Sequence, residues 1–226
     1  FWRRSTGLSG RRKRRAGLAE APRTVPPKAV VFDIGNVLIE WQPEKYYDRI
    51  YGQARREKLF GEVDLHGMNM LVDLGHDFRD TIYGWAGTHP DYAREIMDWH
   101  DNWLELAQPV IQRSVRVLRA LKRRGVPVFA LTNFGVGSFD LACSAYDFLT
   151  EFDIAFVSGR LKLAKPDPAI YAAVEEGSGL RGAELLFADD RAENIAAAEA
   201  RGWRTHLFAN PDAWAGLATA YRAEGR

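Results

Sequence analysis

Short apolar runs alternate with helical stretches along most of the chain, and this alternation constrains the fold more than any other feature. The apolar runs cover residues 29–32, 126–131, 154–158, 185–188 and 203–207. One predicted helix ends near Gly125, and others cover residues 139–149, 168–176 and 192–200. A short, continuous apolar run is typical of a strand buried on both faces. The sequence therefore predicts an α/β fold with a doubly wound parallel sheet.

Residues 44–107 have a different pattern, with helices and no convincing strand. The predicted helices cover residues 44–51, 54–60, 77–86 and 91–107, the last with Asp91 as its N-cap. Many aromatic residues gather here: Tyr46, Tyr47, Phe78, Tyr83, Trp85, Tyr92, Trp99 and Trp103. They predict a small helical domain, which can fold over the strand ends as a lid. We expect a core of residues 28–43 and 108–226 and a helical cap of residues 44–107.

The first 27 residues form a separate basic segment. Through Lys28 the chain has nine basic residues and one acidic residue, a net charge of +8. Because the whole chain carries +1, residues 29–226 carry −7. Such a tail can tether a protein to nucleic acid or to a membrane surface. We favour a disordered extension or a start-site artefact. A secretory signal is not expected, because no apolar run follows the basic block.

The remaining composition indicates a cytoplasmic protein. Cys143 is the one cysteine, so no internal disulfide can form. No apolar run approaches the length of a transmembrane helix. We expect no membrane partner and no nucleic acid bound by the folded body, and the oligomeric state stays open.

Polar side chains follow the predicted strands at the point where each strand ends. In chain order they are Asp33, Thr132 with Asn133, Lys165, and Asp189 with Asp190. Parallel strands present their carboxyl ends at one edge, where α/β folds bind ligands. Three carboxylates there repel one another unless a divalent cation lies between them, and oxygen ligands without His or Cys favour Mg²⁺. With a lysine and a hydroxyl as donors, these groups suit phosphoryl transfer.

Each of these residues also has an ordinary structural explanation. Asp33, helped by Asn36, could cap a helix after the sharp turn that Gly35 permits. Asp189 or Asp190 could cap the helix at residue 192, and Lys165 could be solvated. Their common position at one sheet edge favours the functional interpretation.

The sequence resembles the haloacid dehalogenase superfamily of hydrolases over about residues 29–210. The matching motifs are FDIGNVL at 32–38, LTN at 131–133, LAKPDPAIY at 163–171 and FADDRAEN at 187–194. The resemblance implies a Rossmann-like core with an α-helical cap inserted after the first motif. It is nearest to a phosphatase branch that includes bacterial sugar-1-phosphate phosphatases with an aspartate-any-glycine first motif.

The resemblance also implies residue roles. Asp33 would be the nucleophile that forms an aspartyl-phosphate. Thr132 and the neighbouring amide of Asn133 would hold phosphate oxygens, and Lys165 would steady the nucleophile and the phosphate. The implied Mg²⁺ ligands are Asp33, the Gly35 carbonyl and Asp190, with support from Asp189 and Asn194. The expected function is Mg²⁺-dependent hydrolysis of small phosphate monoesters, sugar-1-phosphates among them.

Gly35 departs from the pattern of most phosphatases in this superfamily, which carry a second aspartate two residues after the nucleophile. Glycine cannot act as an acid or base. The enzyme should therefore favour leaving groups that are stable anions, unless the cap supplies an acid, for which His76 or Asp73 would be the first candidates. We expect Trp41, Trp85 and His76 to shape the cleft.

Two alternatives remain. Loss of the acid favours a metal-independent 2-haloacid dehalogenase, whereas the acidic pair Asp189–Asp190 favours a phosphatase. The other alternative is a non-catalytic binding module on a hydrolase fold.

Overall fold

The structure is a computed structural model that describes residues 27–220, with side chains through residue 216. The expectation for the basic segment of residues 1–27 therefore falls almost wholly outside the described residues. Within them, no helix combines the length and the apolar character needed to cross a membrane.

The centre of the fold is a five-stranded parallel sheet with the strand order β5-β4-β1-β6-β7. The strands are β1 (Ala29–Phe32), β4 (Val128–Thr132), β5 (Ile154–Val157), β6 (Leu185–Asp189) and β7 (Arg204–Leu207). Each one lies within two residues of a strand predicted from the sequence. The predicted parallel α/β fold is therefore confirmed.

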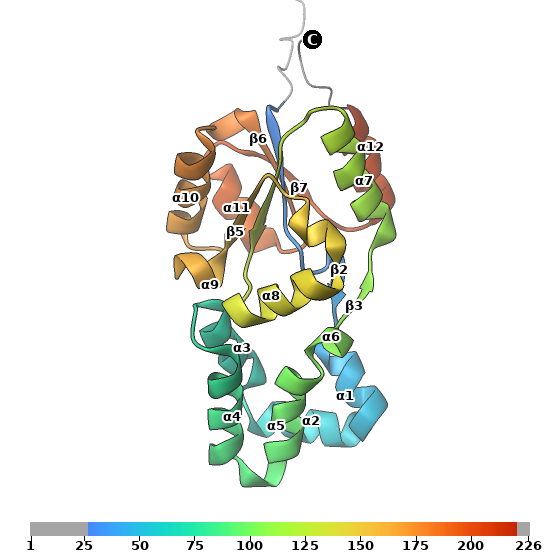
Figure 1. Ribbon diagram of the computed structural model, residues 1–226, viewed down its shortest axis with the longest axis vertical. Coiled ribbons are helices and arrows are strands. Elements are labelled where there is room, and N and C mark those ends of the chain that lie inside the picture. The colour runs from blue at the N-terminus through green and yellow to red at the C-terminus, as the bar shows by residue number, and fades with distance from the viewer. Residues whose placement is uncertain (1–26, 221–226) are drawn as a thin grey trace, which may run out of the picture.

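Alternate residues of β1 pack into two different hydrophobic cores. Val30 and Phe32 belong to the core formed with α7 (Gln112–Arg123), α8 (Val136–Ala145) and α12 (Pro211–Ala220). Ala29 and Val31 belong to the core formed with α10 (Pro168–Ser178) and α11 (Ala192–Glu199). Figure 1 shows these helix groups on either side of the sheet. Burial on both faces explains why the strands read as continuous apolar runs.

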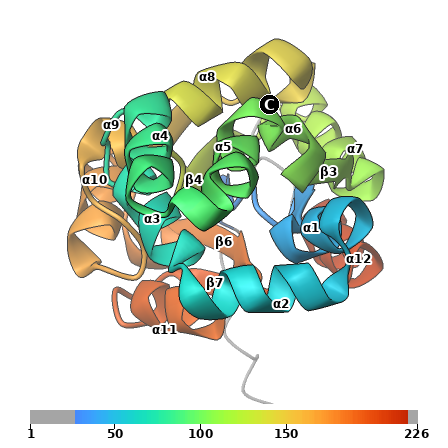
Figure 2. The ribbon, with the colours of Figure 1, turned by 90° about the horizontal axis from the view of Figure 1, so that it is seen from below.

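A helical body lies beyond the carboxyl ends of the strands, as Figures 1 and 2 show. Its helices are α1 (Pro43–Tyr51), α2 (Gln53–Glu62), α3 (Leu65–Asp73), α4 (Phe78–Thr88), α5 (Ala93–Asp101) and α6 (Trp103–Leu106). The chain enters and leaves it through an antiparallel pair, β2 (Ile39–Trp41) and β3 (Ala107–Val110). We use "cap" below for the helices α1–α6; the domain boundaries themselves stay a prediction.

The cap differs from the sequence prediction in three respects. Helix α3 was not predicted, and neither was the β2–β3 pair. The predicted helix at 91–107 is divided into a 3₁₀ turn at Pro90–Tyr92, α5 and α6. Asp91 caps none of these segments, since Tyr92 occupies the N-cap position of α5 and makes no side-chain cap bond. Asp167 is the N-cap of α10, and its side chain accepts a hydrogen bond of 2.8 Å from the Ala169 amide.

The remaining short elements connect these layers. They are α9 (Ser158–Leu161) and the 3₁₀ turns at Asp147–Thr150 and Gly182–Glu184.

Candidate active site

Strand β1 delivers Asp33 to the sheet edge that the cap covers. The Asp33 amide donates a hydrogen bond of 2.9 Å to the carbonyl of Ala188 in β6, which continues the sheet pairing by one residue. Its Oδ1 accepts a hydrogen bond of 2.7 Å from the Ile34 amide. The side chain is 10% exposed. A nearly buried carboxylate at this edge needs a positive partner to offset its lost hydration.

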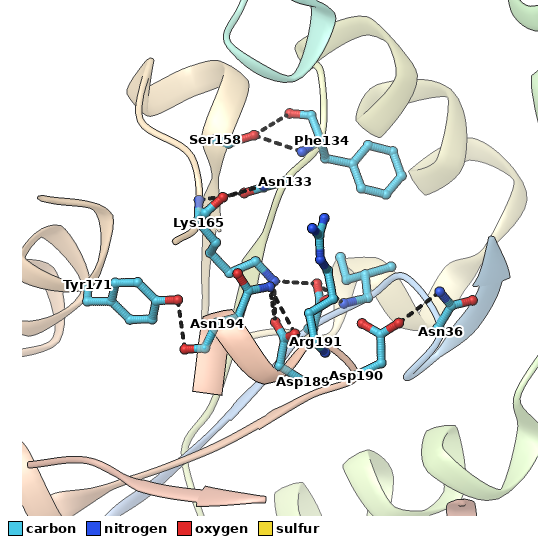
Figure 3. A network of polar contacts seen from close by, with 12 residues as sticks. Asn36, Asn133, Phe134, Ser158, Lys165, Tyr171, Asp189, Asp190, Arg191 and Asn194 are labelled. Atoms are coloured by element: carbon cyan, nitrogen blue, oxygen red, sulfur yellow. Dashed lines mark hydrogen bonds and ion pairs between the residues drawn. The ribbon is translucent and has the colours of Figure 1, made fainter. Parts of the chain in front are cut away.

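Lys165 supplies that positive partner, and it reaches two carboxylates at once (Figure 3). Its Nζ lies 2.8 Å from Oδ1 of Asp33 and 2.6 Å from Oδ2 of Asp189. Burial lowers the pKa of Lys165, but the attraction of the two carboxylates outweighs burial and leaves the pKa raised. The lysine is therefore charged at neutral pH and fixed at the centre of the site.

Both oxygens of Asp189 are engaged by neighbouring groups. Oδ1 accepts from the Arg191 amide at 2.8 Å and from Asn194 Nδ2 at 2.9 Å. Oδ2 accepts from Lys165 and, at 3.0 Å, from Asn194 Nδ2. With two bonds on each oxygen, Asp189 is a positioning residue for Lys165 more than a free ligand.

The side chain of Asn133 is committed to the backbone of Lys165. Its Oδ1 accepts from the Lys165 amide at 2.8 Å, and its Nδ2 donates to the Lys165 carbonyl at 2.9 Å. Asn133 therefore anchors the loop that carries the lysine. Thr132, the last residue of β4, is buried beside it at the same sheet edge.

Asn36, and not Gly35, provides the turn after the nucleophile position. Asn36 has a φ of 54°, in the left-handed region, whereas Gly35 is not among the glycines with positive φ. Asparagine tolerates this conformation better than most residues. Asn36 Nδ2 donates to Asp190 Oδ2 at 2.9 Å, and its Oδ1 accepts from the Trp41 amide at 3.0 Å. The sharp turn that we expected Gly35 to permit therefore does not use the left-handed conformation of glycine, which Asn36 adopts instead.

The carboxylates of Asp33, Asp189 and Asp190 form one cluster. One oxygen from each lies within 4.8 Å of the other two. Burial raises the pKa of Asp33 to about 7, repulsion from Asp189 and Asp190 adds to the shift, and the charge of Lys165 opposes it. Burial also raises the pKa of Asp190. One lysine facing three carboxylates leaves excess negative charge, so this all-oxygen cluster fits a divalent cation such as Mg²⁺.

Ser158 is a buried polar residue near the site that the sequence reasoning did not single out. Its hydroxyl accepts from the Phe134 amide at 2.8 Å and lies 2.6 Å from the carbonyl oxygen of Asp73 in α3. It therefore ties the loop after β4 to the cap. Ser158 directly follows β5, so the strand-end criterion that found Thr132 would have found it as well.

The cap residues expected in the cleft differ in position. Trp41 is partly buried, with its ring centroid 5.7 Å from those of Trp99 and Trp103. Trp85 stacks near His89, with 6.4 Å between ring centroids. His76 is exposed. Of the three, Trp41 is connected to the carboxylate cluster: its backbone amide donates to Asn36, and Asn36 donates to Asp190.

Cys143 is partly buried in α8 with a free thiol. Burial raises its pKa, which agrees with a packing role and not with a nucleophile.

The curated proteins that are similar in sequence to this chain include two from Aspergillus species. A sesquiterpene phosphatase of Aspergillus oryzae is 26% identical over 189 residues, which cover 77% of this chain and 86% of that protein. A drimenol cyclase of Aspergillus calidoustus is 24% identical over 194 residues, which cover 82% of this chain. This chain spans 34% of the length of the cyclase.

A solved structure shares the fold. A HAD family enzyme from Bacteroides thetaiotaomicron has a TM-score of 0.64 and 23% identity, covering 85% of this chain and 98% of that chain. That enzyme has also been solved in complex with magnesium and inorganic phosphate. At this identity the likeness shows the fold alone.

A family model described as haloacid dehalogenase-like hydrolase matches residues 27–202. The match spans β1, the cap and the strand ends that form the carboxylate cluster, and it confirms the resemblance seen in the four sequence motifs. The chain therefore belongs to the family of haloacid dehalogenase-like hydrolases.

Proposed function

We propose that this protein is a Mg²⁺-dependent phosphatase that hydrolyses small phosphate monoesters, sugar-1-phosphates among them, through an aspartyl-phosphate on Asp33. One observation carries the proposal: Lys165 is held between Asp33 and Asp189, next to Asp190. A buried nucleophilic carboxylate, a fixed cation and an acidic cluster are the groups that phosphoryl transfer needs. The phosphatase activity named for the Aspergillus oryzae relative supports the same reaction class.

Asp33 has one oxygen suited to attack. Among the described residues, the hydrogen bonds and the ion pair to its carboxylate end on Oδ1. Oδ2 is therefore the oxygen that would attack phosphorus. Lys165, fixed on the other oxygen, would orient the carboxylate and stabilise the negative charge of the phosphoryl group. The Thr132 hydroxyl and the Asn133 amide, at the end of β4, would hold the phosphate oxygens.

Asp33, Asp190 and the Gly35 carbonyl are the groups that would hold Mg²⁺. Asp189 supports them through Lys165, because both of its oxygens are already occupied. When bound, the ion would neutralise charge on the phosphoryl oxygens and keep Asp33 ionised despite its raised pKa. The side chains in the cluster fit this requirement in both charge and donor type.

The cluster also weighs against the two alternatives. A metal-independent dehalogenase has no use for a third carboxylate beside a nucleophile that one lysine already neutralises. A non-catalytic module would gain nothing from burying Asp33, Lys165 and Asp189 together, because ion pairs of this kind stabilise a fold little compared with apolar packing.

A panel of substrates tests the proposal. Purified protein is assayed on p-nitrophenyl phosphate, glucose-1-phosphate, a sesquiterpenyl monophosphate and 2-chloropropionate, each with Mg²⁺ and with excess EDTA. We expect release of inorganic phosphate that requires Mg²⁺, and no release of chloride. Asp33→Asn is the matched control, with an amide of the same shape. Chloride release in EDTA would establish the dehalogenase instead, and no turnover in any condition would favour the binding module.

A further inference from the structure

The end of helix α3 packs tightly onto the loop that follows β4. The Ser158 hydroxyl lies 2.6 Å from the carbonyl oxygen of Asp73, the last residue of α3. A Cβ at Gly135 would lie 2.4 Å from Val72 Cγ1 and 3.0 Å from the Val72 carbonyl oxygen. Any residue larger than glycine would push the helix away. This contact brings Asp73 of the cap to the loop that begins at Asn133, directly after Thr132 at the end of β4.

The carboxyl of Asp73 is held in a defined position. Asn69 Nδ2 donates to its Oδ2 at 2.9 Å, one helical turn earlier in α3. Burial raises the pKa of Asp73 to about 7, while a hydrogen bond from the Gly135 backbone and the charge of Lys165 lower it. The positive charge of Lys165 therefore acts on the Asp73 carboxyl.

The geometry of displacement points to the cap as the source of the proton. In phosphoryl transfer the attacking and leaving oxygens lie roughly in line on opposite sides of phosphorus. Asp33 attacks from the sheet edge, so the leaving oxygen must point away from the sheet. Helix α3 lies on that side, in the cap that covers the carboxyl ends of the strands.

We propose that Asp73 is the general acid–base of this enzyme and supplies the carboxyl that Gly35 lacks. This inference rests on the phosphatase function proposed above. In the first half-reaction the Asp33 oxygen bonds to phosphorus, the bond from phosphorus to the leaving oxygen breaks, and the Asp73 proton passes to that oxygen. In the second half-reaction the Asp73 carboxylate takes a proton from water, the water oxygen bonds to phosphorus, and the bond to Asp33 breaks.

His76 was an equal candidate on sequence grounds, and the structure separates the two. His76 is exposed, three residues beyond the end of α3. The Asp73 carboxyl is partly buried and bonded to Asn69, on the helix end that contacts the loop after β4.

The test compares Asp73→Asn with wild type on phosphate esters whose leaving groups range from aryl to alkyl alcohols. Asparagine has the same shape and can accept and donate hydrogen bonds, but it cannot transfer a proton. We expect kcat/KM to fall at least about 100-fold for glycerol phosphate and by far less for p-nitrophenyl phosphate. Asp77→Asn, at the exposed N-cap of α4, is the control because asparagine is also a good cap.

A second test uses the wild-type enzyme and so does not depend on whether a variant folds. With Asp73 as the acid, wild-type kcat/KM should depend only weakly on leaving-group acidity, and alkyl turnover should decline above about pH 7 as Asp73 ionises. A steep wild-type dependence, or an equal loss on all esters in Asp73→Asn, would overturn the inference. Both outcomes leave the phosphatase function intact, whereas absence of any Mg²⁺-dependent phosphate release would reject that function itself.

Discussion

The ammonium group of Lys165 lies 2.8 Å from Oδ1 of Asp33, and both side chains are nearly buried. The two residues are far apart in the sequence and meet because one ends β1 and the other follows β5 by a short helix and loop. A buried lysine with two carboxylates at contact distance is strongly ordered, because none of the three can regain water without leaving the others unpaired. This ion-pair group is the structural centre of the proposed chemistry.

Replacing Lys165 by methionine should remove the charge and keep the volume. Two carboxylates would then be buried without compensation, which should destabilise the fold by about 3–5 kcal/mol. Turnover should fall at least about 100-fold, because the phosphoryl charge loses its fixed donor. Urea denaturation and steady-state kinetics measure the two effects. Unchanged turnover in a folded variant would remove Lys165 from the mechanism.

Asn133→Ala should lower kcat, because Lys165 would no longer be held in its position. The variant loses the two hydrogen bonds that pin the Lys165 backbone, at 2.8 and 2.9 Å. We expect kcat to fall roughly 10-fold with a smaller change in KM, since loosening a charged group mainly costs transition-state stabilisation. The exposed Gln53→Ala in α2 is the comparison. An effect on KM alone would indicate that Asn133 serves substrate binding instead.

Gly35→Asp should restore activity to Asp73→Asn. A Cβ at residue 35 meets no atom within 4 Å, and the backbone there does not have positive φ, so the backbone accepts a residue with a side chain. In the Asp73→Asn background we expect at least about a 10-fold gain on alkyl phosphates, and in wild type a much smaller gain, because an acid is already present. Kinetics of the four proteins form a double-mutant cycle. Equal gains in both backgrounds would show that Asp73 and residue 35 do not share a role.

The stability of Asp73→Asn should depend on pH differently from that of wild type. Burial raises the pKa of Asp73 in the folded protein to about 7, above its ordinary value of 3.8. The folded protein therefore binds this proton more tightly, and the associated stability is full below about pH 4 and is lost as pH rises through about 7. Asparagine does not titrate, so the melting temperature of the variant should rise relative to wild type as the pH increases from about 4 to about 7, and the difference should level off above that range. Parallel curves for the two proteins would contradict the raised pKa.

The sequence was sufficient for the sheet and for the residues at its edge. Continuous apolar runs identify strands buried on both faces, and parallel strands bring their carboxyl ends together, so Asp33, Lys165 and Asp189 could be grouped without coordinates. The sequence could not assign a separate role to each of these residues. Only interatomic distances show that both oxygens of Asp189 accept hydrogen bonds and that the Asn133 side chain holds the Lys165 backbone.

Helix α3 shows where sequence reasoning stopped short. Leu65, Met68 and Val72 do form one buried face, and Asp64 caps the helix by accepting from the Gly67 amide at 2.8 Å. Gly67, a poor helix former, hides this pattern. The structure explains its presence, because a Cβ at Gly67 would lie 2.1 Å from Asp64 Oδ2. The missed helix is the one that carries Asp73, so the sequence could name Asp73 as a candidate acid but could not separate it from His76.

The most direct test of the account is detection of the phosphorylated enzyme. The protein is mixed with p-nitrophenyl phosphate and Mg²⁺, quenched in acid within one turnover, digested with a protease and analysed by mass spectrometry. The account predicts one phosphoryl group on the peptide that contains Asp33, and none in Asp33→Asn or in wild type with excess EDTA. Phosphate release without any covalent adduct, or an adduct on a different residue, would contradict the proposed nucleophile.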